Sequence, residues 1–380
     1  MTDLSIVLAG GGTAGHVNPL LALADELRRI RPDVRLTVLG TAEGLEADLV
    51  PAAGLDLTVI EKVPLPRRPS ADWFRFPGRW RRAVRTAGRA IEDSAADAVV
   101  GFGGYVSTPA YIAARRRHVP IVVHEQNARP GLANRLGARS ARSVAVTFPG
   151  TPLPGAQVVG MPLRPAISAL LDERFTDARG TARRGAEALG LDPGRTTVVL
   201  TGGSLGAVRL NAVVVQVAAD LVAAGVQVLH LTGRGKDSPV REARDALAPV
   251  VAAHYHVREY LPEMELALAC ADLVIARSGA GTVSELAALG IPAVYVPLPV
   301  GNGEQRLNAT PVVNAGGGVL VDDAELTPAW LRVHVVPLVA DRDRLAAMGT
   351  RAASVGIRDG AGRLAELVLA AAGAGAGAGR

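Results

Sequence analysis

The amino-acid sequence predicts an α/β protein built from two tandem, doubly wound parallel-sheet domains. Three observations lead to this prediction. Short β-branched runs alternate with longer segments of helical apolar spacing, a glycine-rich turn follows the strand that opens each half, and the two halves resemble each other. Strands that are apolar on both faces are typical of parallel sheets covered by helices on both sides.

The N-terminal half opens with a predicted strand at residues 4–9 and a glycine-rich turn at 10–15. A helix is expected next, because apolar residues recur at helical spacing at Val17, Leu20, Leu21, Ala24, Leu27 and Ile30. Further strands are expected at 34–39, 97–102 and 119–123. This alternation is the βαβ pattern of a parallel sheet.

The C-terminal half repeats the scheme with a strand at 196–201, a glycine-rich turn at 202–206 and a helix at about 211–223. Further strands are expected at 226–231, 272–276 and 292–296. Segments 97–107 and 272–284 are also alike, since each is an apolar strand that ends in glycines. This similarity favours two domains of one plan over a single long sheet.

The domain boundary is expected in the Pro/Gly-rich stretch before residue 165. It divides the chain into an N-terminal domain of residues 1–163 and a C-terminal domain of residues 164–356. A helix at about 357–371 is expected to complete the N-terminal domain. The Ala/Gly repeat at 372–380 has no packing pattern, and we expect it to be disordered.

The composition excludes several classes of protein. With 380 residues, 49% of them hydrophobic and 20% charged, the chain is not extensively disordered. A single cysteine, Cys270, excludes an internal disulfide framework and a multi-cysteine metal site. No apolar run reaches the roughly 18 residues of a spanning helix, and the N-terminus lacks the basic region of a signal peptide. We expect a cytoplasmic protein, and the net charge of +5 weakly indicates anionic partners.

The turn at 10–15 and the following His16 form the first candidate site. Backbone N–H groups at such a turn bind phosphate together with the positive end of the helix dipole. The turn also matches G-x-G-x-x-G, but the acidic residue of a dinucleotide site is missing at the end of the second strand, because Glu43 comes late. A neutral histidine at a helix N-terminus suits a general base, and the alternative is a histidine that braces the loop.

The C-terminal half holds three further candidate loops. The turn at 202–206 could hold a phosphate with backbone N–H groups and the Ser204 hydroxyl. Segment 277–285 would aim helix donors at a diphosphate, and Glu285 either accepts from ribose hydroxyls or only complements the helix dipole. The polar segment 301–308 suits sugar recognition or is a solvent-facing loop.

Metal signatures are absent from the sequence. It contains no H-E-x-x-H, no cysteine cluster and no G-x-x-x-x-G-K-[ST]. Asp341-Arg342-Asp343 imitates a metal-binding D-x-D motif, but it lies far along the chain from the glycine-rich loops, and we interpret it as a solvated face. We therefore expect no required metal.

Residues 73–82 interleave four aromatic side chains with four arginines, and Arg85 and Arg89 extend the basic run. Such a segment is typical of contact with an anionic membrane surface, and equally of a loop whose aromatic residues pack inward. Stacking on nucleic acid is less favoured. The candidate membrane contacts are Trp73, Phe74, Phe76 and Trp80.

As a set, these loops resemble the MurG family of GT-B glycosyltransferases, the UDP-N-acetylglucosamine–N-acetylmuramyl-(pentapeptide) pyrophosphoryl-undecaprenol N-acetylglucosaminyltransferases. Seven motifs carry the resemblance and keep their order and spacing: Gly-Gly-Thr-Ala-Gly-His (11–16), Gly-Thr-Ala-Glu-Gly-Leu-Glu (40–46), Gly-Phe-Gly-Gly-Tyr-Val-Ser (101–107), His-Glu-Gln-Asn (124–127), Gly-Gly-Ser-Leu-Gly-Ala (202–207), Arg-Ser-Gly-Ala-Gly-Thr-Val-Ser-Glu (277–285) and Glu-Gln-Arg-Leu-Asn-Ala (304–309).

The resemblance implies two Rossmann-like domains with an interdomain cleft and a metal-independent inverting glycosyltransferase that needs no cofactor. GlcNAc would pass from UDP-GlcNAc to the C4 hydroxyl of the MurNAc in undecaprenyl-pyrophosphoryl-MurNAc-pentapeptide, converting lipid I to lipid II. His16 is the first candidate for the base, although it could instead bind the acceptor pyrophosphate. Glu125 is the other candidate catalytic residue.

Residue by residue, the resemblance implies a donor site in the C-terminal domain. Arg164 and the backbone at Leu261 would contact uracil, Glu285 the ribose hydroxyls, and Gln305 the GlcNAc. The remaining donor-binding residues would be Ser204, Ala280, Gly281, Thr282, Val283 and Ser284.

The acceptor would lie on the N-terminal domain, with its pyrophosphate on Thr13, Ala14 and Gly15. The cleft would also be lined by Tyr105, Asn127 and Asn134. Two positions depart from the family pattern: Ala14 stands where a glycine is usual, and Glu304 stands where many members have a second glutamine.

The resemblance also implies a peripheral protein at the cytoplasmic face of the cell membrane, with a role in cell wall biogenesis, cell shape and cell division. Cell-wall synthesis proteins are expected partners, and nucleic acid is not. Three alternatives stay open: a nicotinamide-dependent oxidoreductase, a non-catalytic nucleotide-binding or membrane-scaffold protein, and a sugar-nucleotide epimerase of the same fold.

Overall fold

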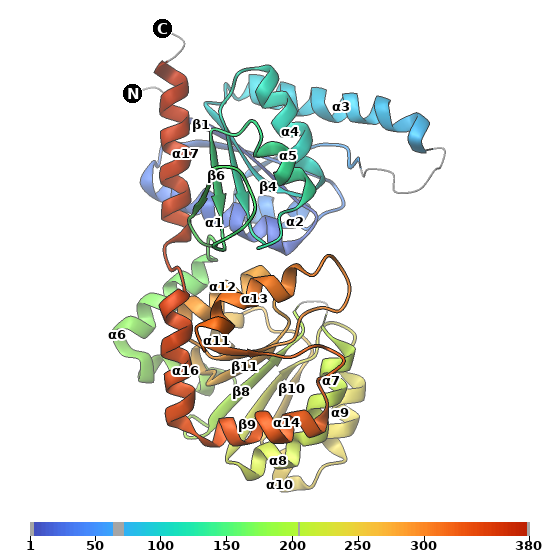
Figure 1. Ribbon diagram of the computed structural model, residues 1–380, viewed down its shortest axis with the longest axis vertical. Coiled ribbons are helices and arrows are strands. Elements are labelled where there is room, and N and C mark those ends of the chain that lie inside the picture. Colours follow the sequence, from blue (N-terminus) through green and yellow to red (C-terminus); the bar gives the residue numbers. More distant parts are fainter. Residues whose placement is uncertain (1–3, 64–71, 204–205, 378–380) are drawn as a thin grey trace. The chain divides into compact units, whose positions relative to one another are not determined.

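A computed structural model describes residues 4–63, 72–203 and 206–377. The chain divides into two compact units (Figure 1). The first comprises Met1–Pro165 and Asp359–Arg380, and the second comprises Ala166–Arg358. Arg164 therefore belongs to the first unit.

The first unit contains a seven-stranded parallel sheet in the order β3-β2-β1-β4-β5-β6-β7. Its strands are β1 (Ser5–Gly10), β2 (Arg35–Gly40), β3 (Asp56–Val59), β4 (Ala98–Gly103), β5 (Ile121–Glu125), β6 (Ser143–Val146) and β7 (Ala156–Val158). Its helices are α1 (Ala14–Ile30), α2 (Glu46–Ala52), α3 (Asp72–Asp93), α4 (Gly104–Arg116), α5 (Leu132–Gly137) and α17 (Gly360–Gly377).

Strand β1 is buried on both faces because its alternate side chains enter two different cores. Ile6 and Leu8 pack with residues of α1 and α17. Val7 and Ala9 pack with residues of α3 and α4 on the other face. This two-sided burial explains why the strand is apolar throughout rather than alternating.

Loops that bind ligands in such sheets follow the carboxyl ends of the strands where the strand order reverses. In the first unit the chain runs outward from β1 through β2 to β3 and then returns to place β4 beside β1. Gly10 pairs with Gly103 at this point, after a register shift in β1. The turns that follow β1 and β4 are therefore neighbours.

The second unit has a six-stranded parallel sheet in the order β10-β9-β8-β11-β12-β13, so its reversal lies between β8 and β11. Its strands are β8 (Thr196–Thr201), β9 (Val226–Leu231), β10 (Tyr255–Arg258), β11 (Leu273–Ala276), β12 (Ala293–Tyr295) and β13 (Gly318–Leu320). Its longer helices are α6 (Pro165–Ala188), α9 (Ser238–Asp245), α12 (Ala280–Leu289), α13 (Glu304–Asn314) and α16 (Arg342–Val355). Its short helical segments are α7 (Val208–Val214), η1 (Val215–Val217), α8 (Ala218–Ala223), α10 (Pro249–Ala252), α11 (Met264–Cys270), α14 (Pro328–His334) and α15 (Val336–Ala340).

Two sequence predictions are corrected here. The expected disorder of residues 372–380 is wrong as far as Gly377, because α17 continues to that residue. Alanine is the best helix former, and Ala371 and Ala372 are buried in the first unit's core, which explains the continuation. The helix expected at 211–223 is divided into α7, η1 and α8.

Within the described ranges, no helix is long and apolar enough to cross a membrane.

Candidate functional site

The turn between β1 and α1 exposes unused backbone donors. Thr13 precedes the helix in extended geometry, its side chain makes no capping hydrogen bond, and the first turn of α1 holds no acidic residue. Thr13 and Gly15 are exposed, and Ala14 is half-buried. An uncapped helix N-terminus with accessible N–H groups is suited to bind an anion.

His16 is held in one orientation by this turn. Its Nδ1 lies 3.2 Å from the Gly11 carbonyl oxygen and 3.1 Å from Thr13 Oγ1. Because a carbonyl oxygen can only accept, we assign the ring proton to Nδ1, which leaves the lone pair on Nε2. Burial lowers the pKa of His16, and the bond to Gly11 and the charge of Glu46 oppose this effect. The ring is therefore a neutral base near neutral pH.

Two glycines bring β4 against the His16 loop. A Cβ atom on Gly103 would lie 3.1 Å from His16 Nε2 and 3.4 Å from Asn134 Nδ2, and the residue has φ +98°. A Cβ atom on Gly104, with φ +78°, would lie 2.6 Å from the Gly11 carbonyl oxygen. Glycine is needed at both positions. Because Gly103 has no side chain, His16 Nε2 and Asn134 Nδ2 can both lie close to it.

Glu125 ends β5 and braces the loop that follows. Its Oε1 accepts from the Asn127 N–H at 2.9 Å, and its Oε2 accepts from the Gly131 N–H at 2.9 Å and from Asn134 Nδ2 at 3.0 Å. Burial raises the pKa of this carboxyl group, and these hydrogen bonds partly offset the rise. Both oxygens have a structural use, and the catalytic role of Glu125 stays a prediction.

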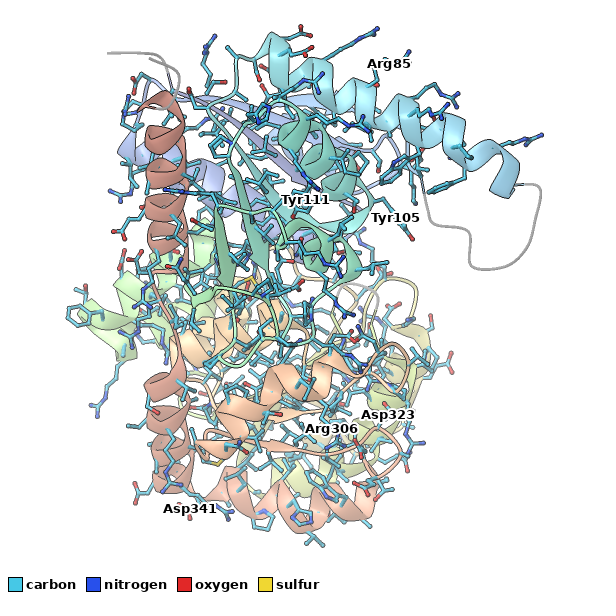
Figure 2. All side chains as sticks on the ribbon, turned by 45° about the horizontal axis from the view of Figure 1, so that its top comes forward. Arg85, Tyr105, Tyr111, Arg306, Asp323 and Asp341 are labelled. Atoms are coloured by element: carbon cyan, nitrogen blue, oxygen red, sulfur yellow. The ribbon has the colours of Figure 1, made fainter. Side chains whose placement is uncertain are left out.

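Asn134 lies beneath the site and not at its surface, since it is 2% exposed. Its Oδ1 accepts from the Tyr111 hydroxyl at 2.8 Å, while its Nδ2 donates to the His124 carbonyl oxygen and to Glu125. Tyr105, in contrast, is 45% exposed and points away from the core, with Lys62 Nζ 5.8 Å from its ring centre (Figure 2). The sequence reasoning missed Tyr111, although its spacing from Ser107 on one helix face was a usable signal.

Glu46 was also missed as a site residue, although it ends one of the motifs. Its side chain is completely buried, Oε2 accepts from the Gly12 N–H at 2.8 Å, and Oε1 accepts from Thr41 N–H at 2.8 Å and Thr41 Oγ1 at 2.7 Å. Burial favours the protonated form, but these bonds outweigh it and lower the pKa of Glu46. The carboxylate therefore ties the loop after β2 to the His16 loop.

In the second unit, the turn after β8 is built from glycines. A Cβ atom on Gly206, with φ +64°, would lie 2.0 Å from the Thr232 carbonyl oxygen, so only glycine fits there. Asn211 on α7 donates to the same carbonyl at 2.9 Å. Ser204, the predicted phosphate ligand of this turn, lies outside the described residues.

Helix α12 begins directly after β11 with an open N-terminus. Gly279 precedes it without a side-chain cap, and its first turn contains no acidic residue. No atom lies within 4 Å of a Cβ built on Gly279 or Gly281, so the backbone is accessible. The side chains of Ala280 and Val283 are buried, whereas Gly281, Thr282, Ser284 and Glu285 are half-buried. Ala280 and Val283 can therefore offer a ligand little beyond their backbone.

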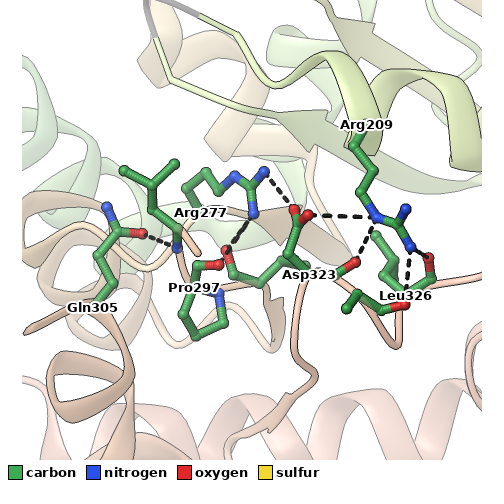
Figure 3. A network of polar contacts seen from close by, with 9 residues as sticks. Arg209, Arg277, Pro297, Gln305, Asp323 and Leu326 are labelled. Carbon is green, nitrogen blue, oxygen red and sulfur yellow. Dashed lines mark hydrogen bonds and ion pairs between the residues drawn. The ribbon is translucent and has the colours of Figure 1, made fainter. Parts of the chain in front are cut away.

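An arginine–aspartate network joins three loops at this edge of the second sheet (Figure 3). Arg277 Nη2 lies 2.6 Å from Asp323 Oδ1, and Arg277 Nη1 donates to the carbonyl oxygens of Val296 and Pro297 at 3.2 and 3.1 Å. Arg209 of α7 donates to the Asp323 carbonyl oxygen at 2.6 Å. Sequence reasoning did not find this network, because its members are far apart along the chain.

Gln305 closes the loop that follows β12. Its Oε1 accepts from the Leu298 N–H at 2.9 Å (Figure 3), which leaves its Nε2 as a donor. Leu261 is buried in the connection between β10 and α11.

Asp341 is exposed and caps α16 by accepting from the Arg344 N–H at 2.9 Å, and Figure 2 places it away from Arg306 and Asp323. The solvated-face interpretation of the D-x-D sequence is confirmed.

The segment at 73–82 belongs to helix α3. The side chains of Trp73 and Phe74 lie outside the described residues. Phe76 and Trp80 stack with ring centres 5.7 Å apart and pack partly against the first unit's core. On the outer face of the helix, Arg81, Arg85 and Arg89 are exposed at four-residue spacing (Arg85 is labelled in Figure 2).

Comparison with known proteins agrees with this geometry. Residues 6–146 match the glycosyltransferase family 28 N-terminal domain, and residues 197–364 match the family 28 C-terminal domain. The chain is 54% identical over 380 residues to the UDP-N-acetylglucosamine–N-acetylmuramyl-(pentapeptide) pyrophosphoryl-undecaprenol N-acetylglucosamine transferase of Bifidobacterium longum, covering 96% of each chain. It is 55% identical to the protein of that name from Nocardioides sp., covering 96% of this chain and 98% of the relative.

Among solved structures, the MurG crystal structure from Acinetobacter baumannii superposes with a TM-score of 0.77 at 27% identity, covering 97% of this chain and 99% of that one. The prediction of two parallel α/β domains of the GT-B type is confirmed by this similarity and by the two sheets. The chain belongs to glycosyltransferase family 28 and, within it, to the MurG family.

Proposed function

We propose that this protein transfers GlcNAc from UDP-GlcNAc to the C4 hydroxyl of the MurNAc in undecaprenyl-pyrophosphoryl-MurNAc-pentapeptide, with inversion at the anomeric carbon. The observation that carries the chemistry is His16, whose Nδ1 is anchored to Gly11 and whose Nε2 is free beside an open helix N-terminus. The names of relatives more than half identical to the chain support the choice of substrates.

The donor half of the proposal uses the second unit. The open N-terminus of α12 would bind the diphosphate, Glu285 the ribose hydroxyls, and the free Nε2 of Gln305 the sugar. Uracil would contact the backbone at Leu261, and Ser204 would add a phosphate contact. The Arg277–Asp323 pair holds the loops that carry these groups.

The reaction is one displacement. The C4 oxygen of the acceptor attacks the anomeric carbon while His16 Nε2 takes the hydroxyl proton, and the bond between that carbon and the β-phosphate oxygen breaks. UDP leaves with the bonding electrons, and the N-terminus of α12 stabilises its developing charge in the role that a metal ion has in other transferases. The acceptor pyrophosphate would occupy the N-terminus of α1, next to the base.

Glu46 weighs against a nicotinamide-dependent oxidoreductase. A dinucleotide site needs a free carboxylate near the end of the second strand for the ribose. Glu43 comes late, at an exposed position of the following loop, whereas Glu46 is fully buried and its two oxygens accept hydrogen bonds from Gly12 and Thr41. It has no remaining exposure with which to bind a cofactor.

A product assay tests the proposal. The protein is incubated with UDP-GlcNAc, a short-chain lipid I analogue and excess EDTA, and the products are identified by mass spectrometry and by the anomeric proton coupling in NMR. We expect a β-linked disaccharide lipid and UDP in equal amounts. Formation of a UDP-sugar epimer without the acceptor would instead identify an epimerase, and no turnover would favour a binding protein.

We further propose that the first unit docks peripherally on the anionic cytoplasmic face of the membrane through α3. Arg81, Arg85 and Arg89 form an exposed basic stripe without a carboxylate partner among the described residues, whereas Arg79 and Arg82 pair with Glu61. Replacing the three stripe arginines with Gln should weaken sedimentation with phosphatidylglycerol vesicles. The same change at Arg241, Arg332 and Arg351 of the second unit is the charge-matched control, and equal losses would contradict α3 docking.

A further inference from the structure

A cavity of about 770 Å³ opens in the second unit, at the edge of the sheet where strands begin. Thr197 near the start of β8, Asp272 before β11 and Pro292 before β12 line it. The donor-type loops follow the opposite, carboxyl ends of the same parallel strands. The cavity is therefore separate from the site described above, and neither the motifs nor the proposed reaction uses it.

Five arginines line this cavity, which we call the arginine cavity. Three come from α6, one precedes β8 and one opens α16: Arg174, Arg179, Arg183, Arg195 and Arg342. The one acidic residue in the lining is Asp272, and its Oδ2 already accepts from the Thr197 N–H at 2.7 Å. The lining therefore carries a large excess of positive charge.

Most of this charge has no neutralising partner. Arg174 donates to the Ala269 carbonyl oxygen at 3.1 Å, and Arg342 donates to the Gly194 carbonyl oxygen at 3.2 Å. Carbonyl bonds orient a guanidinium group without cancelling its charge. Arg179 and Arg183 have no ion-pair partner within the ranges that the structure describes, and Arg195 lies 3.7 Å from Asp192. Burial lowers the pKa of Arg174, and the charge of Asp272 opposes this effect only in part.

Local breaks in the chain produce this arrangement. Helix α6 is kinked at Asp177 (φ −150°, ψ 80°), whose carboxylate accepts from the Gly180 N–H at 2.8 Å and so restarts the helix. After the kink, Arg179 and Arg183 share one face four residues apart. Arg184 does not line the cavity and pairs with Glu173 at 3.5 Å.

The wall of the cavity opposite the α6 arginines is formed by a helix with small side chains. Helix α16 lines the cavity with small side chains at helical spacing, namely Ala346, Gly349, Thr350 and Ala353. A narrow wall of this kind leaves the volume unfilled between it and the arginines. The volume lies within the roughly 300–1,000 Å³ that is usual for small-molecule sites.

From the uncompensated arginines and the open volume, we infer that the arginine cavity binds a phosphate-bearing anion. Guanidinium groups match phosphate oxygens with paired hydrogen bonds, and several of them together suit a di- or triphosphate group better than a single carboxylate. Such a group occurs in soluble polyphosphates and nucleotides, and a single phosphate occurs in the headgroup of an anionic phospholipid. The inference does not depend on the proposed transferase reaction.

The first experiment titrates inorganic tripolyphosphate into the full chain by calorimetry, with saturating UDP to fill the donor site. We expect one site per chain, and a loss of affinity of roughly tenfold or more in Arg183→Ala and in the double variant Arg179→Ala/Arg183→Ala. Arg184→Ala is the matched control, because it removes the neighbouring charge of the same helix outside the cavity. Its affinity should stay within about twofold of the unchanged protein.

The second experiment sediments the same variants with phosphatidylglycerol or phosphatidylcholine vesicles, in a background where Arg81, Arg85 and Arg89 are Gln. A loss specific to Arg183→Ala on phosphatidylglycerol vesicles identifies a lipid headgroup as the ligand, and a loss confined to tripolyphosphate identifies a soluble one. Equal losses in Arg183→Ala and Arg184→Ala would mean non-specific charge attraction and overturn the inference. Failure of the unchanged protein to bind either probe would overturn it as well.

Discussion

His16 and Glu46 act on the same loop from opposite sides. His16 contacts the Gly11 carbonyl oxygen, while Glu46 accepts from the Gly12 N–H and also from Thr41. The carboxylate thus fixes the peptide that orients the histidine ring, and its negative charge favours the protonated form of His16. Glu46, distant from His16 in sequence, therefore influences both the position of His16 Nε2 and the pKa of the ring.

The first prediction concerns Glu46→Gln. The new amide would direct an N–H group at one of the backbone donors, leaving a buried donor unsatisfied, and should cost about 1–3 kcal/mol of the first unit's stability. Denaturant unfolding monitored by circular dichroism measures this cost. Glu43→Gln, at an exposed position of the same loop, is the control and should be near neutral. An unchanged Glu46→Gln midpoint would contradict the role given to the carboxylate.

The second prediction concerns the acid limb of the rate–pH profile. Protonation of His16 removes the base, and because its pKa is lowered in the folded protein, activity should fall only below the ordinary histidine value of 6.5. Glu46→Gln removes a charge that favours protonation, so its limb should move to still lower pH. Steady-state kcat/KM measured against pH gives the acid limb of the unchanged protein and that of Glu46→Gln. A limb that moves upward in Glu46→Gln would refute the electrostatic coupling.

At the scale of elements, helix N-termini and the loops before them carry the ligand sites. Helices α1 and α12 both begin without a side-chain cap, directly after the strands β1 and β11 that border the reversal of strand order. In the second unit, Arg277 and Asp323 hold the surrounding loops, with side chains only 12% and 11% exposed. Open helix ends give affinity for phosphate, and the buried ion pair gives the loops their position.

Gly281→Ala tests whether a ligand contacts the backbone of α12, because it should change UDP affinity without lowering stability. No atom lies within 4 Å of the added methyl group, and alanine is favoured over glycine inside a helix, so the unfolding midpoint should not fall. A diphosphate lying against this backbone would meet the methyl group, and UDP affinity should drop by roughly tenfold. Calorimetric titration of UDP measures the effect, and Gly373→Ala in α17 is the control. Unchanged UDP affinity would remove α12 from the donor site.

The Arg277–Asp323 pair can be compared with an exposed pair of the same unit. Removing Arg277 leaves the largely buried Asp323 carboxylate with Arg209, at 3.4 Å, as its remaining ion-pair partner, so Arg277→Ala should destabilise the second unit by about 2–3 kcal/mol. Arg306 and Asp322 also form an ion pair, but their side chains are 50% and 48% exposed, and Arg306→Ala should cost about 0–1 kcal/mol. Differential scanning calorimetry measures both. Similar costs for the two variants would contradict the structural role of the network.

At the scale of the whole molecule, sequence periodicity predicted the features that depend on neighbouring residues, namely strands and turns. The strands β8 and β9 have the predicted bounds, and the glycine-rich turns lie where the strand order reverses, because apolar runs and glycines are local signals. The helical end of α17 was missed because an Ala/Gly repeat shows no amphipathic pattern, although its first alanines are buried. Glu46, Tyr111 and Arg277 were missed because their respective partners Gly12, Asn134 and Asp323 are distant in sequence.

The most direct test of the account is the transfer rate of His16→Gln with UDP-GlcNAc and a lipid I analogue, measured beside its UDP-GlcNAc affinity. If Nε2 of His16 takes the proton, kcat should fall by about 100-fold to 10,000-fold. UDP-GlcNAc affinity should stay unchanged, because the donor would bind in the other unit. A variant that keeps the full kcat would contradict the central claim that His16 is the base of this glycosyl transfer.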